Sequence, residues 1–260
     1  MTIEVDNEWW KSLFDDIYLK TDARSVGDEA LTQREVNLLC ELIPLRPSHK
    51  ILDLCGGQGR HSLELCRRGF SHCTVLDFSS VLLVEGIQSA KRLNLSVEFV
   101  QGDARDIPLP SAGFHHVLIL GNSMGYSGDD GADLDIVRES HRLLEHGGWI
   151  AIDVTDGNAV RKRFNPNAWH EIGEDMVVCR QRELQENRIC AREMVIDKRS
   201  GLVRDRTYGM RLYDGDALQS LVSDAGFDHV RLYRDFTSFL GDGDVGFMNH
   251  RMIVVAQKTQ

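Results

Sequence analysis

A glycine-rich turn follows a short apolar stretch, in the run Ile51-Leu52-Asp53-Leu54-Cys55-Gly56-Gly57-Gln58-Gly59. Glycines at such a turn let a ligand approach the backbone closely, and the N-terminus of a following helix favours negative charge. This arrangement occurs in many nucleotide-binding sites, but it also occurs where the chain is simply packed tightly. The residues that come after the turn therefore have to distinguish between the two interpretations.

Two acidic residues stand where the next two predicted strands end. Asp77 ends the second strand, where a carboxylate in an open α/β sheet can accept hydrogen bonds from ribose hydroxyls. The alternative for Asp77 is a helix cap, because Ser79 and Ser80 follow it. Asp103, in Gly102-Asp103-Ala104, follows the third strand and is placed to reach an adenine amino group. Two acids at successive strand ends favour an adenosine.

A nicotinamide dinucleotide is the competing ligand. Its pyrophosphate requires the pattern G-x-G-x-x-G/A, but Ser62 occupies the last position and the charged Asp53 precedes the turn. A carboxylate directed at the turn repels pyrophosphate and suits a cationic amino-acid group. The residues favour adenosine joined to an amine over adenosine joined to phosphates.

The elements that must position these residues alternate between short apolar stretches and helical patterns, which predicts a parallel sheet with crossover helices. We expect strands at 50–54, 72–76, 97–100, 116–120 and 149–153, and helices at 60–68, 81–93 and 134–144, the last ending at Gly147-Gly148. Three alternating stretches at 176–184, 188–198 and 203–212 predict an inserted antiparallel meander. A helix at 214–225 and strands at 230–233 and 251–256 then complete the domain.

Taken in order, these motifs resemble the class I S-adenosylmethionine-dependent methyltransferases over residues 50–156. The motifs are Asp53 with Gly57 and Gly59, Asp77, Gly102-Asp103-Ala104, Gly121-Asn122-Ser123 and Gly147-Gly148. The resemblance implies an α/β fold with a Rossmann-like seven-stranded sheet whose last strand is antiparallel, here carrying the inserted β meander. It implies S-adenosylmethionine as cofactor. One position departs from the family pattern, because Cys55 stands where the family has the first glycine of the loop.

The resemblance also implies which residues bind the cofactor. Asp77 would bind the ribose, and Asp103 with Ala104 the adenine. An N-terminal arginine, Arg34, would pair with the cofactor carboxylate, with a solvated helix face as the alternative. Tyr18 together with Trp10 would face the sulfonium if the N-terminal helix closes over the site, with ordinary helix packing as the alternative. The remaining cofactor-binding residues are Asp53, Gly57 and Gly59 around the methionine part, and Gly121 after the fourth strand.

The segment after the fourth strand bears on the acceptor. Its Gly121-Asn122-Ser123 run is similar to that of small-amine methyltransferases, and it lacks the Asn/Asp-Pro-Pro-aromatic motif of many enzymes that methylate bases. We expect Asn122 and Tyr126 to orient the acceptor and His170 to remove a proton, with a surface imidazole as the alternative for His170. The resemblance disfavours glycine as acceptor, because the related amino-acid enzymes carry an arginine just beyond the fifth strand, whereas here Val154-Thr155-Asp156 follows Asp153.

The composition and charge of the chain restrict the kinds of partner that it can bind. The 260-residue chain carries a formal charge of -10, which repels a phosphate backbone, so we expect a small-molecule acceptor and no nucleic acid. Apolar runs far shorter than the ~20 residues of a membrane helix, and a start unlike a secretory signal, predict a cytoplasmic protein without a membrane partner. Its six cysteines form no C-x-x-C pair, so we expect reduced thiols and no bound metal. A homodimer remains an open possibility.

We expect four parts: an N-terminal helical lid at 1–45, a cofactor-binding α/β core at 46–156, an insertion at 157–213 that caps the acceptor site, and the C-terminal part of the core at 214–260. The insertion carries twelve basic and eight acidic side chains. This excess predicts that Arg161 or Arg163 contacts an anionic acceptor. There are two alternatives: the basic side chains pair with an acidic face of a second subunit, or arginine pairs such as Arg180 and Arg182 form a solvated face of the sheet.

These observations predict methyl transfer from S-adenosylmethionine to a small molecule, with an amine nitrogen as the favoured atom. Three alternatives stay open: a hydroxyl or macromolecular acceptor, a non-catalytic cofactor-binding module, and a hydride-transferring dehydrogenase.

Overall fold

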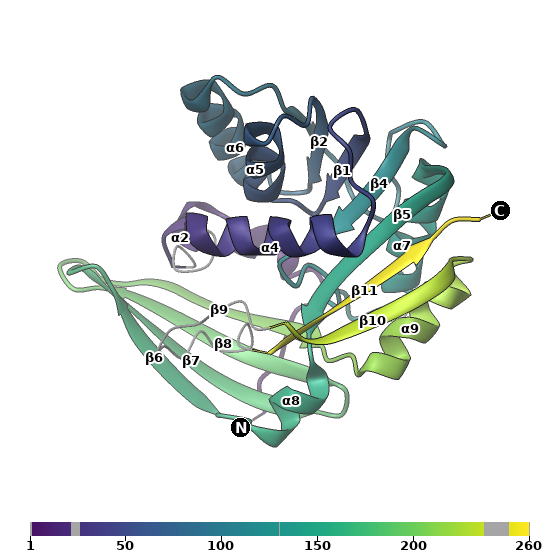
Figure 1. The fold of residues 1–260 in the computed structure, drawn as a ribbon. Coiled ribbons are helices and arrows are strands. Elements are labelled where there is room, and N and C mark those ends of the chain that lie inside the picture. Colours follow the sequence, from purple (N-terminus) through teal and green to yellow (C-terminus); the bar gives the residue numbers. More distant parts are fainter. Residues whose placement is uncertain (1, 22–26, 130, 237–249, 260) are drawn as a thin grey trace.

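The computed structural model describes residues 2–21, 27–129, 131–236 and 250–259 (Figure 1). Its central sheet has seven strands in the order β10-β11-β5-β4-β1-β2-β3. The strands β1 to β5 pair in parallel, whereas β11 is antiparallel to both β5 and β10. The predicted Rossmann-like sheet with an antiparallel last strand is confirmed. The strands are β1 (Lys50–Leu54), β2 (His72–Asp77), β3 (Glu98–Gln101), β4 (Phe114–Ile119), β5 (Leu144–Thr155), β10 (Asp228–Phe236) and β11 (Arg251–Gln257).

Helices cover both faces of this sheet. On one face α4 (Glu29–Leu42) and α5 (Arg60–Arg67) share a core with Ile51 and Leu118, and α6 (Ser80–Leu93) packs beside β2 and β3. On the other face α7 (Ala132–Leu143) and α9 (Gly215–Asp224) pack against Leu52 and Val117. Successive side chains of β1 and β4 thus pack into the cores on opposite faces of the sheet. Because both faces are buried, the sequences of these strands are continuous apolar runs.

The insertion forms a separate antiparallel sheet in the order β6-β7-β8-β9, preceded by α8 (Gly157–Lys162). Its strands are β6 (Asn167–Ile172), β7 (Met176–Gln185), β8 (Arg188–Asp197) and β9 (Gly201–Arg211). The sequence predicted only three of these strands. It missed β6, an edge strand whose residues are polar or partly exposed, including Trp169 at 71% exposure.

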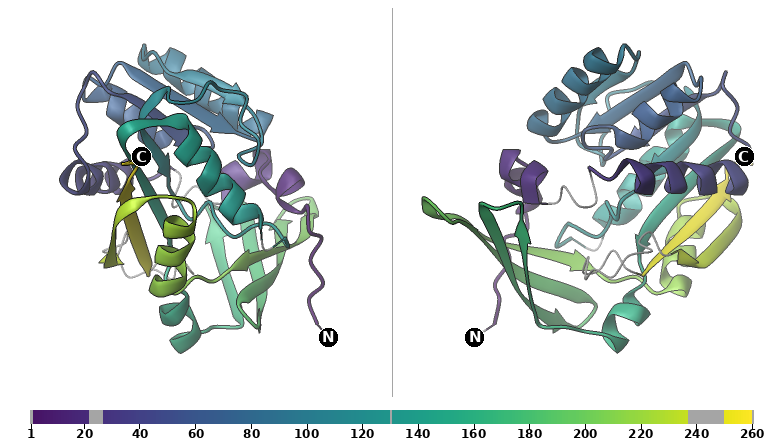
Figure 2. Two further views of the ribbon diagram at one scale, coloured as in Figure 1. Left: turned by 90° about the vertical axis from the view of Figure 1, so that its right-hand side faces the viewer. Right: turned by 60° about the vertical axis from the view of Figure 1, so that its left-hand side comes forward.

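The N-terminal segment contains two short helices, α1 (Trp10–Leu13) and α2 (Asp16–Thr21). Figure 2 shows them between the central sheet's layer of helices and the second sheet. Residues 22–26 of the predicted lid and residues 237–249 of the predicted C-terminal part lie outside the described residues.

One boundary differs from its prediction. The helix α7 ends at Leu143 and β5 begins at once, so Gly147 and Gly148 lie within the strand instead of ending the helix. The N–H of Gly147 donates to the Lys258 carbonyl at 2.7 Å, and the Lys258 N–H donates to the Gly148 carbonyl at 2.9 Å. Gly147 has φ +84°, which glycine adopts without strain.

Three histidines gather at the end of the sheet that lies opposite the glycine turn. His49 Nδ1 lies 2.7 Å from His116 Nε2, and the rings of His49 and His115 stack with centroids 4.4 Å apart. Burial, with His49 and His115 nearby, lowers the pKa of His116 to about 3. The unfolded chain therefore binds a proton at this residue between about pH 6.5 and pH 3, and the folded chain does not.

This difference predicts that stability falls as the pH drops below about 6.5. At pH 5 the contribution of His116 alone is about 2 kcal/mol of destabilisation. In His116→Leu, the free energy of unfolding measured in urea should no longer fall by this amount between pH 7 and pH 5. The exposed His72 provides the control, since His72→Leu should leave the pH dependence as in the wild type. An unchanged pH dependence in His116→Leu would contradict the prediction.

Candidate active site

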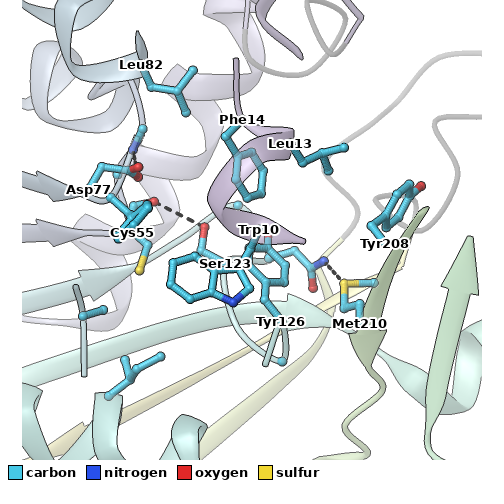
Figure 3. A pocket seen from close by; sticks show the side chains of 18 of the residues that line it. Trp10, Leu13, Phe14, Cys55, Asp77, Leu82, Ser123, Tyr126, Tyr208 and Met210 are labelled. Carbon is cyan, nitrogen blue, oxygen red and sulfur yellow. Dashed lines mark hydrogen bonds between the residues drawn. The ribbon is translucent and has the colours of Figure 1, made fainter. Parts of the chain in front are cut away.

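A cavity lies at the carboxyl ends of β1, β2 and β4 and extends to the second sheet (Figure 3). Four parts of the chain line it: the glycine turn, the ends of the parallel strands, the N-terminal helices and the insertion. The lining residues include Trp9, Trp10, Phe14 and Tyr18; Cys55, Gly56, Gly57 and Gln58; Asp77; Gly102, Asp103, Ala104 and Arg105; Gly121, Asn122, Ser123 and Tyr126; and Arg180, Arg182, Glu193, Tyr208 and Met210.

The glycine turn needs glycine for two physical reasons. Gly57 and Gly59 have φ +58° and +74°, in the left-handed region. A Cβ on Gly59 would lie 2.9 Å from Val75 Cγ2, and a Cβ on Gly56 would lie 2.7 Å from Asp53 Cγ. Cys55 departs from this rule, because it is a non-glycine residue at φ +57°, a conformation that costs of order 1–3 kcal/mol.

Asp77 joins the turn to the second strand. Its Oδ2 accepts the Gly57 N–H at 2.7 Å and its Oδ1 accepts the Ser79 N–H at 2.8 Å. Burial raises the pKa of Asp77, while these backbone donors lower it. The cap of α6 is the side chain of Ser79, which accepts the Leu82 N–H, so Asp77 does not cap that helix itself. A carboxylate oxygen has room for a second donor, and Asp77 lines the cavity.

Asp53 lies beneath the turn and is fully buried. Ser62 Oγ donates to its Oδ2 at 3.0 Å, and within the described part of the chain its Oδ1 has no hydrogen-bond partner. Burial raises the pKa of Asp53, with His61, Ser62 and Arg60 acting against that rise. Asp53 does not line the cavity, and its contact with Ser62 lies behind the turn.

Asp103 is paired with a residue that the sequence analysis did not single out. The Arg105 guanidinium donates to both oxygens of Asp103, at 2.9 and 2.5 Å, and lies 5.2 Å from the centroid of the Trp10 ring. Hydrogen bonding from Arg105 lowers the pKa of Asp103, which therefore stays ionised. Asp103, Ala104 and Arg105 form one wall beside Asp77.

The loop after β4 joins the central sheet to the insertion. The Gly121 N–H donates to Asp153 Oδ2 at 3.2 Å. Asn122 Oδ1 accepts the Thr155 N–H at 2.8 Å, and Asn122 Nδ2 lies 2.6 Å from Met210 Sδ. The amide of Asn122 therefore holds the loop as well as lining the cavity.

Tyr126 lies in an aromatic cluster at the far end of this loop. Its ring centroid lies 5.0 Å from that of Trp9 and 5.6 Å from that of Phe14. The Trp9 indole also donates to the Tyr126 carbonyl at 3.1 Å. These contacts fix Tyr126 between the N-terminal segment and the loop.

Four residues assigned to the site do not line the cavity: Asp53 and Gly59 of the glycine turn, Arg34 and His170. Arg34 lies on α4, and the lining arginine nearest to it in sequence is Arg60. His170 lies on β6, the edge strand of the second sheet. Arg161 and Arg163 are also absent from the lining, since Arg161 lies close to the Leu212 carbonyl and Arg163 contacts His250.

A buried charge network supports the loop after β4 from behind. Arg251 is fully buried, donates from Nε to Asp153 Oδ1 at 2.6 Å and pairs with Glu35. Glu35 also pairs with Arg60 and lies 2.8 Å from His61 Nε2. Asp153 is the carboxylate that accepts the Gly121 N–H, so the network links α4, α5, β5 and β11 to the cavity.

Comparison with known proteins places this geometry among methyltransferases. Residues 51–148 match a family model described as a methyltransferase domain. The demethylmenaquinone methyltransferase of Listeria welshimeri is 30% identical over 125 residues, which is 45% of this chain and 50% of that protein. The chain thus spans about half the length of such curated relatives.

Solved structures share the fold over nearly the whole chain. An S-adenosylmethionine-dependent methyltransferase from Clostridium acetobutylicum superposes with a TM-score of 0.75 at 14% identity, covering 94% of this chain and 97% of the other. A sugar N-methyltransferase from a Streptoalloteichus species has a TM-score of 0.60 at 18% identity, covering 100% of this chain and 95% of the other. At these identities the likeness concerns the fold alone. None of the helices in the described ranges is both long and apolar enough to cross a membrane.

Proposed function

Because the chain carries a class I S-adenosylmethionine-dependent methyltransferase domain, we propose that it transfers a methyl group from this cofactor to a small-molecule acceptor. The family predicted from the glycine turn and the strand-end acids is confirmed. The observation that carries the proposal is the cavity itself, because the glycine turn and Asp77 line it together with the loop after β4 and the insertion.

The cofactor half of the cavity fits an adenosine joined to an amino acid. We assign the ribose hydroxyls to Asp77 and the adenine to Asp103 with Ala104, which all line the cavity. We assign the methionine part to the turn, which lines the cavity at Gly56, Gly57 and Gln58. Arg60 lines the cavity where Arg34 does not, so we assign to Arg60 the pairing with the cofactor carboxylate.

The acceptor half is formed by the loop after β4, the N-terminal helices and the insertion. S-adenosylmethionine supplies an already activated methyl group, so the protein's task is to align the acceptor atom with it. Tyr18 and Trp10 line the cavity from the N-terminal segment, consistent with a lid formed by residues 1–45. Five lining residues come from residues 157–213, which supports their role as a cap over the acceptor.

We propose an amine nitrogen as the methylated atom. The support is the Gly121-Asn122-Ser123 run, which is similar to that of small-amine methyltransferases. Proton removal is needed only if the amine arrives protonated. His170 lies off the cavity, so a direct role for it requires a movement of β6.

The function is tested by incubating the protein with methyl-labelled cofactor and fractionated extract. We expect label in a small molecule, identified by mass, together with S-adenosylhomocysteine. Label in protein or nucleic acid would show a macromolecular acceptor. Cofactor binding without S-adenosylhomocysteine would show a non-catalytic module, and binding of a nicotinamide dinucleotide in its place would show a dehydrogenase.

Tyr126 provides a test of the acceptor loop. Tyr126→Phe keeps the ring contacts with Trp9 and Phe14 but removes the hydroxyl, so turnover should fall about tenfold, equivalent to one hydrogen bond in the transition state. Cofactor affinity, measured by calorimetry, should stay within about twofold. Tyr233→Phe on β10 is the matched control and should leave turnover unchanged.

Asn122→Ala should also lower turnover while sparing cofactor binding. Because Asn122 Oδ1 accepts the Thr155 N–H, the melting temperature of this variant must be measured alongside. Full activity in both Tyr126→Phe and Asn122→Ala would place the acceptor elsewhere.

A further inference from the structure

Asp133, which the sequence analysis did not single out, is a buried carboxylate in the wall of the cavity. It lies in the first turn of α7, where an acidic residue ordinarily serves the helix dipole, and it is 2% exposed. Its two oxygens instead accept hydrogen bonds from the loop after β4 and from the end of the insertion. The carboxylate therefore joins two parts of the chain that both line the cavity.

One oxygen of this carboxylate holds the loop after β4. Asp133 Oδ1 accepts the Gly125 N–H at 3.0 Å in a buried hydrogen bond, and the Gly125 carbonyl accepts the Arg211 N–H at 2.8 Å. Gly125 has φ +84°, and a Cβ there would lie 3.0 Å from the backbone nitrogen and carbonyl oxygen of Arg211. The loop and the end of β9 thus meet at a position that requires glycine, directly before Tyr126.

The other oxygen holds the end of the insertion. The Tyr213 hydroxyl donates to Asp133 Oδ2 at 2.5 Å, and Arg211 Nη1 lies 3.4 Å from the same oxygen. Burial, together with the negative charge of Asp133, raises the pKa of Tyr213, which therefore keeps its proton and remains a donor. The Tyr213 carbonyl accepts the Gly157 N–H at 2.8 Å. Through Tyr213, Asp133 is linked to both ends of the insertion.

The direction of the Tyr126 ring depends on two sets of contacts. Trp9 Nε1 and Arg188 Nη2 approach the Tyr126 carbonyl at 3.1 and 3.3 Å. These contacts hold the peptide group that follows Tyr126, whereas Asp133 holds the one that precedes Gly125. Without the second contact the loop can turn about the first, and the ring then changes its direction in the cavity.

We propose that Asp133 is a positioning residue for methyl transfer, because its carboxylate holds Tyr126 and the insertion in the relative arrangement that aligns the acceptor with the cofactor. This inference rests on the proposed function, since it concerns the acceptor half of the same cavity. A carboxylate suits this task, because its two oxygens accept from Gly125 and Tyr213 at once, whereas an amide has a single oxygen. A misplacement of about 1 Å can lower turnover about 100-fold, so a residue that never touches the acceptor can control the rate.

Asp133→Asn tests the proposal, because the amide oxygen can serve only one of the two donors. Hydrogen exchange, measured by mass spectrometry on the peptide that covers residues 121–127, reports on the loop without any acceptor. We expect the protected amide of this peptide to exchange at least about tenfold faster in Asp133→Asn, the equivalent of one hydrogen bond to a charged group. Asp135→Ala, at an exposed position of the same helix, is the matched control and should exchange as the wild type does.

Methyl transfer separates positioning from a merely structural role. With methyl-labelled cofactor and extract, transfer by Asp133→Asn should fall at least about tenfold, whereas its affinity for S-adenosylhomocysteine should stay within about twofold of the wild type. Tyr213→Phe removes one donor but keeps the Gly125 hydrogen bond, so both exchange and transfer should change about threefold in the same directions. Thermal unfolding checks each fold, and Tyr213→Phe decides if Asp133→Asn does not fold.

Unchanged exchange of residues 121–127 in the folded variant would overturn the proposal, as would transfer equal to that of the wild type. A loss of cofactor affinity as large as the loss of transfer would also overturn it, since that result would show a general structural role for Asp133. Failure of the proposed function would be seen separately, as absent transfer by the wild type, while the exchange measurement still decides whether Asp133 holds the loop.

Discussion

Replacing Arg251 by methionine is expected to lower the free energy of unfolding by about 3–5 kcal/mol. The side chain is fully buried and pairs with both Glu35 and Asp153. Its removal would leave the buried negative charges of Glu35 and Asp153 without the positive charge of Arg251. This costs far more free energy than the loss of an exposed ion pair. The measurement is equilibrium unfolding in urea at pH 7.

The pH dependence of this effect has a defined sign. Burial raises the pKa of Glu35, but Arg251, His61 and Arg60 together hold it well below its ordinary value of 4.5. A depressed carboxyl pKa contributes stability above the unfolded-state pKa, and that stability is lost as the pH falls. The difference in the free energy of unfolding between the wild type and Arg251→Met should therefore become smaller below about pH 4.5.

Arg231→Met is the matched control for this prediction. Arg231 lies on the neighbouring strand β10, is exposed, and stands 5.2 Å from the Trp149 ring centroid. Such a contact contributes about 0.5–1 kcal/mol. Equal losses in Arg231→Met and Arg251→Met would mean that the buried network adds nothing to stability.

Replacing Asp77 by alanine is expected to weaken binding of S-adenosylmethionine by about 3–4 kcal/mol, roughly a few hundredfold in Kd. The variant loses the carboxylate that would receive the ribose hydroxyls. It also loses the acceptor of the Gly57 N–H, so the turn is held less firmly. Calorimetric titration of the cofactor measures the change.

Asp135→Ala, at an exposed position of α7, should bind the cofactor as the wild type does. Asp77→Asn separates the two contributions, because an amide oxygen can still accept the Gly57 N–H but carries no charge. An affinity unchanged in Asp77→Ala would refute the assignment of the ribose position.

The amino-acid sequence by itself determined the family and the central sheet. Strand and helix alternation has a local cause, since side-chain periodicity and glycine backbone freedom act within a few residues. Gly57 and Gly59 take the left-handed φ values that only glycine adopts readily. That Asp77 and Asp103 lie at the same edge of the sheet could also be predicted, because each follows a parallel strand and parallel strands end at one edge.

Only the tertiary structure decided which charged residues meet. Arg251 and Glu35 are 216 positions apart in the chain, and no local pattern relates them. The sequence pointed to Arg34 for the cofactor carboxylate, but the arrangement of α4 and α5 brings Arg60 and not Arg34 to the cavity. In the insertion, alternation predicted that Arg180 and Arg182 share one face of a strand, but it could not say which face is covered. Packing of the second sheet against the N-terminal segment buries that face, because burial depends on contacts between distant elements and not on the period of the sequence.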